Sequence, residues 1–307
     1  MVQFKAGAKI RNTSFRIVAA FLAPALISYL FFVVYPLFKV FRLSFYDWRG
    51  VKAGAEVFVG FGNFKSLMLD PIFWRALSNN LLLFVFVLLI SIIFALFFSY
   101  FIATKIKFSG LYKAAWLFPN ILGDIIVVTI WLFIYHPTMG MLNYILSKIG
   151  IHVGALPWLG RADTALIAVS IPMIWKYMGL YIILFTAAIQ EIPSSFLEAA
   201  RIDGASRWKE FLHVILPLLK PTIAVAIVFM MYNSFSVIFT YIKFLTEGGP
   251  YRSTEVLPTY IFQVGFELHK FGYGSAISVV TFLLVSVFAI FIIRTLMRSL
   301  IHGETGF

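Results

Sequence analysis

The chain has 307 residues, of which 61% are hydrophobic and only 12% are charged, whereas a soluble domain is roughly half apolar and about a quarter charged. This composition excludes an ordinary soluble domain and indicates an integral membrane protein. The net charge of +12 comes from basic residues spread between apolar stretches, which argues against a nucleic-acid-binding face, and the absence of cysteine excludes disulfides and thiolate metal sites.

Six stretches are long and apolar enough to cross a bilayer as helices. Such a span needs about 20 apolar residues, because each backbone N–H and C=O must find its partner within the segment when water is absent. The stretches comprise residues 17–38, 81–103, 114–135, 164–190, 221–242 and 273–293. The third and the fourth each carry one charge, Asp124 and Lys176. The sequence therefore predicts an all-α integral membrane protein with six transmembrane helices.

Basic residues determine the predicted orientation. Residues 1–16 contain four basic residues and no acid, which places the N-terminus in the cytosol by the positive-inside rule. Six spans then return the C-terminus to the same side. We therefore expect a cytosolic segment at 1–16, a transmembrane domain at 17–298 and a cytosolic tail at 299–307, in a multi-pass protein of the cell membrane.

A charged segment, EAARIDGASRWKEFLHVILP at residues 198–217, lies between the fourth and fifth spans and therefore on the predicted cytosolic side. Ser195 to Glu198 match the capping box S-x-x-E, which predicts the start of a short helix. Gly204 can take the left-handed conformation that ends a helix, and Ser206 can cap a second one. The loop 192–217 is therefore expected to form an elbow of two short helices.

Two roles fit this elbow when the residues alone are considered. An amphipathic helix at the membrane surface would anchor the loop in lipid headgroups. Alternatively, the small residues Ala199 and Ala200 would let the backbone of another chain approach closely. Glu198 and Arg201 flank them at the spacing of an i,i+3 ion pair.

The elbow resembles a known loop. EAARIDGASRWKEFLHVILPLLKP, residues 198–221, is similar to the cytosolic EAA loop of permease subunits of ABC importers. LTEGGPYRSTEVLPTYIFQVGFELHKFGYGSAISVV, residues 245–280, resembles the Gly-Gly-Pro and Gly-Tyr-x-Ser-Ala segments of carbohydrate-uptake permeases of the maltose and glycerol-phosphate type. Pro119, Trp131 and GMLN at 140–143 fit the same pattern, and LTEGGP is more like the first of the two permease subunits.

The resemblance implies a type I ABC importer permease fold and a role in an ATP-driven importer that depends on a binding protein. The chain would form half of the translocation path for a sugar or oligosaccharide. The implied partners are a homologous second permease subunit, two copies of a cytosolic ABC ATPase and an extracytoplasmic solute-binding protein, in membrane lipid and without nucleic acid. The implied coupling residues are Glu198, Ala199, Ala200, Asp203 and Gly204.

The chain is not expected to be an enzyme. The phosphate-binding loop G-x-x-x-x-G-K-[ST] does not occur in the sequence, so ATP hydrolysis must reside in another chain. We therefore expect no cofactor in this chain, with ATP and Mg bound by the partner ATPase.

Two spans carry the expected solute path. The resemblance places a solute near mid-membrane against the spans that flank the EAA loop, and tyrosines there would offer flat apolar faces and hydroxyls to a sugar. The expected path residues are Lys176, Tyr177, Tyr181, Tyr232, Asn233, Phe235 and Ser236. The alternatives are that Lys176 pairs with Asp124 or extends to the interface, and that the polar residues join neighbouring helices.

Other functions stay open at this point. The same machinery would import glycerol phosphate or an acidic oligosaccharide if Lys176 served as a counter-charge. A stand-alone secondary transporter is a further alternative, although no inverted repeat is evident. An intramembrane enzyme would have to use Asp124 and Lys176 as its acid–base pair.

Overall fold

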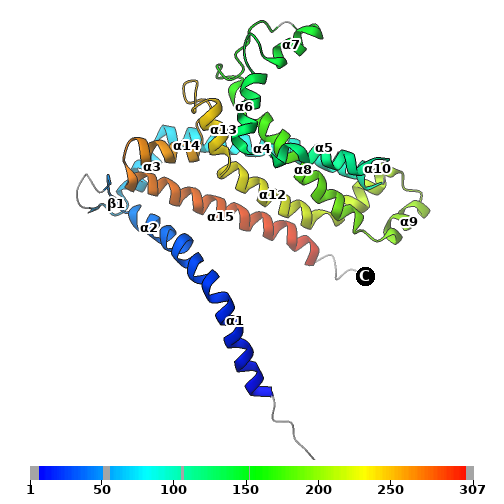
Figure 1. The fold of residues 1–307 in the computed structure, drawn as a ribbon, viewed down its shortest axis with the longest axis horizontal. Coiled ribbons are helices and arrows are strands. Elements are labelled where there is room, and N and C mark those ends of the chain that lie inside the picture. Colours follow the sequence, from blue (N-terminus) through cyan, green and yellow to red (C-terminus); the bar gives the residue numbers. More distant parts are fainter. Residues whose placement is uncertain (1–6, 51–55, 105–106, 152, 302–307) are drawn as a thin grey trace, which may run out of the picture. The chain divides into compact units, whose positions relative to one another are not determined.

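Helices form most of the chain in the computed structural model, which describes residues 7–50, 56–104, 107–151 and 153–301 (Figure 1). The predicted cytosolic segments therefore lie partly outside the described residues, at 1–6 and 302–307. The chain divides into two units: residues up to 69 together with 264–280, and residues 70–263 together with those from 281 onward.

The first unit begins with a long apolar helix. Its parts are α1 (Gly7–Tyr29), the π-helical turn η1 (Leu30–Val34) and α2 (Tyr35–Leu43). A short antiparallel pair follows, formed by β1 (Tyr46–Asp47) and β2 (Val57–Phe58), and then α3 (Gly62–Met68). The π-helical turn η4 (Gln263–Glu267) precedes α15 (Phe271–Ile301), of which only the part up to Val280 belongs to this unit. Near the start of α15, the amide of Gly272 donates to the carbonyl of Trp48 at 3.1 Å.

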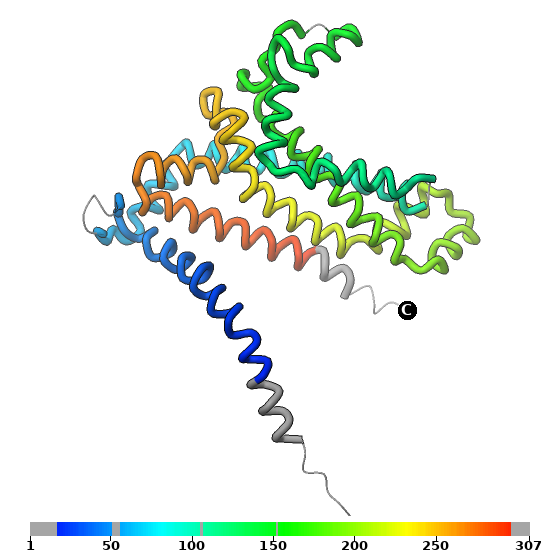
Figure 2. Tube along the Cα trace, in the orientation of Figure 1, coloured from blue at the N-terminus to red at the C-terminus, as the bar shows by residue number. Residues whose placement is uncertain are grey.

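The second unit is a helical bundle with irregular ends. Its helices are α4 (Pro71–Ala103), α5 (Ser109–Ile121), α6 (Asp124–Ile134), α7 (Met141–Lys148), α8 (Ala165–Gln190), α9 (Ser194–Ile202), α10 (Arg207–Glu210), η3 (Phe211–Ile215), α11 (Leu216–Leu218), α12 (Lys220–Phe235), α13 (Ile238–Leu245) and α14 (Leu257–Phe262). Helix α8 packs against α4, α5 and α12, and these helices run side by side in Figure 1. Figure 2 follows the chain from α8 through α9 and α10 and back into α12.

Helix α8 is the centre of this bundle because it contributes to both buried apolar clusters. In one cluster, Tyr181 and Phe185 of α8 pack with residues of α4 and α12. In the other, Val169 and Met173 of α8 pack with residues of α6 and α13. The two ends of α8 are thus fixed to different partners, the first end to α6 and α13 and the last to the elbow side.

The predicted spans are largely confirmed. Within the described residues, five helices are long and apolar enough to cross a membrane: Ile17–Leu43, Pro71–Ala103, Ala165–Gln190, Lys220–Leu245 and Phe271–Thr295. The second span starts ten residues earlier than the expected position 81, because Asp70 accepts hydrogen bonds from the amides of Ile72 and Phe73 and so caps α4 at its beginning.

The third span differs from the prediction. Residues 114–135 do not form one straight helix, because α5 and α6 meet at a bend of 96°, and only together do they provide a sixth span. The bend arises where Leu122 and Gly123 adopt extended backbone conformations, with ψ of 141° and 147°. Pro119 in the last turn of α5 lacks the amide that would continue the hydrogen-bond ladder, which favours the break.

The contact between α5 and α8 requires a glycine. A Cβ at Gly179 would lie 1.9 Å from the carbonyl oxygen of Trp116, so the two backbones touch at this point. We expect Gly179→Leu to lower the free energy of unfolding by about 3 kcal/mol, the upper end of typical overpacking costs, because backbone cannot move aside as a side chain can. Unfolding midpoints in detergent measure this.

The matched control for that variant is Gly110→Ala in the first turn of α5, where an added Cβ meets nothing within 4 Å. It should leave stability equal or slightly higher, since alanine favours helix. Equal midpoints for both variants would show that the close approach of α5 and α8 does not limit stability.

Candidate functional site

A charged cluster joins three helices of the second unit. One carboxylate oxygen of Asp124, Oδ1, accepts a hydrogen bond from Lys176 Nζ at 2.5 Å. The same oxygen accepts from the Tyr177 hydroxyl at 3.2 Å and from the Tyr241 hydroxyl at 3.0 Å. The Lys176 side chain is 7% exposed and that of Asp124 is 31% exposed. Of the alternatives for Lys176, pairing with Asp124 is therefore the one that the structure shows.

The bend in the third span positions this carboxylate. Asp124 is the first residue of α6, where unpaired amides and the positive end of the helix dipole favour a negative charge. Lys176 and Tyr177 come from the middle of α8, and Tyr241 comes from α13. The cluster holds α6 against both helices and carries no net charge, because one ammonium faces one carboxylate.

A second polar contact joins α8 and α12. Asn233 Nδ2 donates to the hydroxyl of Tyr181 at 3.5 Å, the long end of the hydrogen-bond range. Tyr181 is buried and Asn233 is half-buried. Tyr177 and Tyr181, which are four residues apart and therefore neighbours on the surface of α8, contact different partners, the Asp124 carboxylate and Asn233.

The remaining predicted path residues lie at the end of α12. Tyr232 is 61% exposed, Ser236 is also exposed and Phe235 is half-buried. Helix α12 ends at Phe235 and α13 begins at Ile238, so a short turn at Ser236 and Val237 interrupts the helix within one apolar span.

Sequence reasoning missed Tyr241. It is fully buried, and its hydroxyl donates to a carboxylate 117 positions away in the chain. The sequence did contain a signal for Tyr241, because a tyrosine buried in an apolar span needs a hydrogen-bond partner for its hydroxyl. The identity of that partner depends on how α6 and α13 pack.

The elbow has the predicted turn, with a different beginning. Gly204 has a φ of +78° and closes α9 in a Schellman motif: its amide donates to Arg201 O at 3.1 Å, and the amide of Ala205 donates to Ala200 O at 2.9 Å. The predicted capping box is wrong, because Ser195 lies inside α9. The helix starts after Pro193, whose extended conformation (ψ 134°) ends the preceding turn, and no side chain caps it.

One ion pair fastens the two arms of the elbow. Arg201 of α9 donates from Nε and Nη2 to the carboxylate of Glu210 at 2.9 and 3.2 Å, instead of pairing with Glu198 as its spacing suggested. These hydrogen bonds and the negative charge of Glu210 raise the pKa of the Arg201 guanidinium. The second arm begins at Ser206, whose hydroxyl accepts from the amide of Lys209 at 3.4 Å, so the predicted cap is confirmed.

The outer surface of the elbow is open in the isolated chain. Of the predicted coupling residues, Ala200 is half-buried, and the exposed ones are Glu198, Ala199, Asp203 and Gly204. A Cβ at Gly204 would meet nothing within 4 Å. Large apolar side chains, missed by the sequence analysis, also point outward: Ile202 is 86% exposed, Trp208 65% and Phe196 53%. An exposed patch of this kind is typical of a docking surface.

Comparisons with known proteins agree with this architecture. Residues 108–302 match the family model described as "Binding-protein-dependent transport system inner membrane component". A probable ABC transporter permease protein of Pyrococcus horikoshii is 33% identical over 90% of this chain and 94% of its own. The diacetylchitobiose uptake system permease protein of Streptomyces coelicolor is 32% identical over 94% of this chain and 83% of its own.

A solved structure supports the fold. A chain of a bacterial ABC transporter that imports the acidic polysaccharide alginate superposes with a TM-score of 0.81 at 24% identity, covering 94% of this chain and 99% of that one. The predicted type I permease fold is thus confirmed. Because the family model matches well over half of the chain and relatives align along almost all of it, the chain belongs to the inner membrane components of binding-protein-dependent transport systems, the permease subunits of ABC transporters.

Proposed function

We propose that the chain forms one half of the membrane path of an importer for a neutral sugar or oligosaccharide. The observation that carries this proposal is the similarity, over 94% of the chain, to a permease named for diacetylchitobiose uptake. Family membership supplies the membrane role and the dependence on a binding protein. The second half of the path would come from a homologous permease subunit.

The charge of the Asp124 cluster favours a neutral cargo. An anionic solute in a low-dielectric path needs an unpaired cation, and Lys176 is already in contact with a carboxylate at 2.5 Å. Separating the two would leave both charges poorly solvated. Glycerol phosphate and acidic oligosaccharides, which would use Lys176 as a counter-charge, are therefore the less favoured cargo.

Uptake competition tests the cargo. The complete transporter, reconstituted in vesicles with its binding protein and a labelled neutral oligosaccharide, should be inhibited by unlabelled neutral sugars and not by glycerol phosphate or uronic-acid oligomers. Competition by the acidic compounds at equal or lower concentrations would contradict a neutral cargo, while competition by neither class would contradict the carbohydrate proposal as a whole.

The exposed end of α12 is the proposed contact with the solute. Tyr232 presents a ring and a hydroxyl, and Asn233 presents an amide that binds the Tyr181 hydroxyl only at the long limit of 3.5 Å. Tyr177 is a weaker candidate for the path, because its hydroxyl already binds Asp124.

We expect Asn233→Ala and Tyr232→Ala each to raise the half-saturating solute concentration by about three- to tenfold, the effect of losing one hydrogen bond. Solute uptake by the assembled transporter measures this, with ATP hydrolysis as the check on assembly. Tyr144→Ala, which removes an exposed tyrosine of α7 outside the proposed path, is the control. Undiminished uptake in both α12 variants would remove these residues from the path.

The elbow is the proposed coupling element. The ATPase subunit, which would bind ATP and Mg, is proposed to dock on the surface formed by Glu198, Ala199, Asp203 and Gly204, in two copies per transporter. The Schellman turn and the Arg201–Glu210 pair support this role, because a firmly held elbow can transmit force to α8 and α12. An extracytoplasmic binding protein would deliver the solute on the opposite side.

A further inference from the structure

A groove runs between the end of α4 and the second arm of the elbow. It has a volume of about 450 Å³, and its walls are almost entirely apolar. The side chains that matter for its chemistry are Phe97, Tyr100 and Phe101 of α4, and Arg207, Trp208 and Phe211 of the elbow. The hydroxyl of Tyr100 donates to the carbonyl of Arg207 at 3.5 Å, so the two walls touch where the arm begins.

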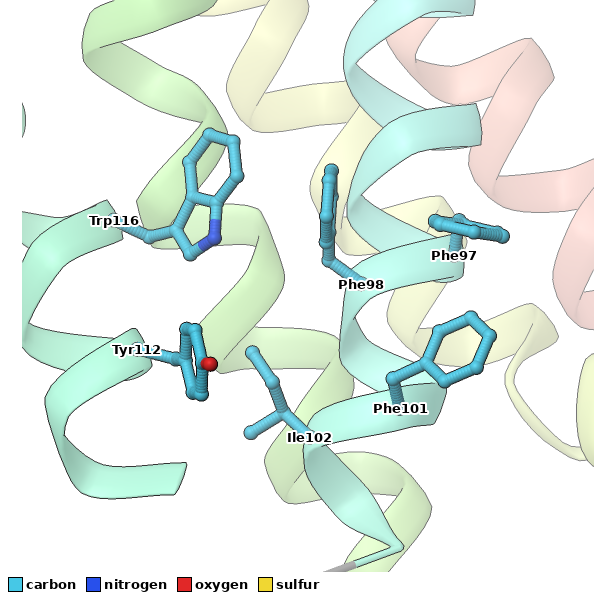
Figure 3. A pocket seen from close by; sticks show the side chains of 6 residues that line it. All are labelled: Phe97, Phe98, Phe101, Ile102, Tyr112 and Trp116. Atoms are coloured by element: carbon cyan, nitrogen blue, oxygen red, sulfur yellow. The ribbon is translucent and has the colours of Figure 1, made fainter. Parts of the chain in front are cut away.

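A second hollow lies beside the first on α4. It has a volume of about 570 Å³ and is lined by Tyr112 and Trp116 of α5 and by Phe98 and Ile102 of α4, whose side chains are drawn in Figure 3. The rings of Trp116 and Phe98 are in contact, with centroids 4.8 Å apart. Phe97 and Phe101 line both hollows and form the ridge between them. The surface thus offers two neighbouring apolar hollows, which suits a ligand with two apolar chains.

The rim of the groove is basic. Arg207 is exposed, and among the residues that the structure describes no carboxylate forms an ion pair with it, because Glu210 is engaged by Arg201. Lys209 on the same arm and Lys107 in the connection after α4 are exposed as well, but they do not line the groove. An anionic group at the rim would therefore meet a guanidinium that is free to bind it bidentately.

The position of the groove matches the boundary of a bilayer. It lies where the apolar span of α4 ends at Ala103 and the charged elbow begins. Trp208 is 65% exposed and stacks on Phe211, with ring centroids 5.8 Å apart and an interplanar angle of 24°. Exposed tryptophan next to arginine is typical of the level at which acyl chains meet headgroups.

We propose that this groove binds an anionic phospholipid of the cytosolic leaflet, with its phosphate on Arg207 and its acyl chains against Phe97, Phe101 and Trp208. An anionic phospholipid fits this groove because its acyl chains match the apolar walls and its phosphate matches the guanidinium of Arg207 at the rim. The bound lipid contacts both α4 and the elbow. The lipid composition of the membrane would therefore affect how firmly the elbow, the proposed coupling element, is held. The site is separate from the solute path and does not depend on the identity of the cargo.

Quenching of Trp208 fluorescence tests the proposal. The assembled transporter is reconstituted in phosphatidylcholine vesicles that contain equal mole fractions of either brominated phosphatidylglycerol or brominated phosphatidylcholine. The contribution of Trp208 is the difference between wild type and Trp208→Phe. We expect brominated phosphatidylglycerol to associate about fivefold more strongly, as expected for one cation near a lipid headgroup.

Three variants make the test specific. Arg207→Gln should abolish the preference, Arg207→Lys should retain most of it, and Lys209→Gln, which neutralises an exposed cation of the same arm outside the groove, should also retain it. Equal quenching by the two lipids, or equal losses in Arg207→Gln and Lys209→Gln, would overturn the proposal. Absence of quenching by either lipid would also overturn it, because a protein segment would then cover the groove. If Arg207→Gln does not assemble, the wild-type preference and the Arg207→Lys variant decide the outcome.

Discussion

Asp124→Asn should lower the free energy of unfolding of the permease by about 3 kcal/mol, the lower end of the usual cost of removing one partner of a buried ion pair, because the Asp124 side chain is itself 31% exposed. The substitution keeps the shape of the side chain and removes its charge, so the ammonium of Lys176, whose side chain is 7% exposed, loses its counter-ion. The hydroxyls of Tyr177 and Tyr241 lose a charged acceptor at the same time. Denaturant or thermal unfolding in detergent measures the effect.

The double variant Asp124→Asn/Lys176→Met separates lost charge from lost packing. Removing both charges should recover most of the stability, because no unpaired ion is then left in the bundle. The matched control is Asp163→Asn in the loop before α8. Asp163 forms an exposed ion pair with Arg161, and the two side chains are 60% and 52% exposed, respectively. That variant should unfold like the wild type, since solvent screens the pair. A stable Asp124→Asn protein would show that the pair does not hold the bend of the third span.

Gly204→Pro should abolish the coupling between solute and ATP hydrolysis while leaving the spans inserted. The native φ of Gly204 is +78°, and proline fixes φ near −65° and has no amide to donate to Arg201 O. The Schellman turn therefore cannot form, and the two arms of the elbow change direction. We expect solute-stimulated ATP hydrolysis to fall at least about tenfold, the loss that follows when a docking contact of roughly 1.4 kcal/mol disappears.

Gly204→Asn is the matched control for this position. Asparagine tolerates the left-handed conformation, and nothing lies within 4 Å of an added Cβ in the isolated chain. It should therefore retain the turn and more of the coupling than Gly204→Pro, and any remaining loss would report the side chain added to the proposed docking surface. Normal coupling in Gly204→Pro would contradict the proposed role of the elbow. In that case the ATPase would dock on another surface of the permease.

The elbow illustrates which features could be predicted from sequence. The left-handed Gly204 and the cap at Ser206 depend on residues within one or two turns of each other, so local patterns identify them. The capping box at Ser195 failed for a local reason as well, because Pro193 starts the helix earlier than the pattern implied. The pairing of Arg201 was not predictable by spacing, since Glu210 reaches it only after the chain has turned at Gly204.

The candidate path shows the opposite case. Lys176 is conspicuous in the sequence as a charged residue in an apolar span. The sequence does not distinguish a Lys176 that pairs with Asp124 from one that contacts the solute. The answer depended on the 96° bend at residues 122–123, which brings the start of α6 against α8 and α13. The same packing determines that Tyr177 and Tyr241 bind one carboxylate.

By itself, the sequence determined that this protein crosses a membrane, roughly where its spans lie and where a polar elbow interrupts them, because hydrophobic length and turn residues act over short distances. Only the tertiary structure decided which charges neutralise each other and which aromatic surfaces remain open. Those outcomes depend on contacts between helices 52 to 117 positions apart, and the pattern within any one helix does not specify its neighbours.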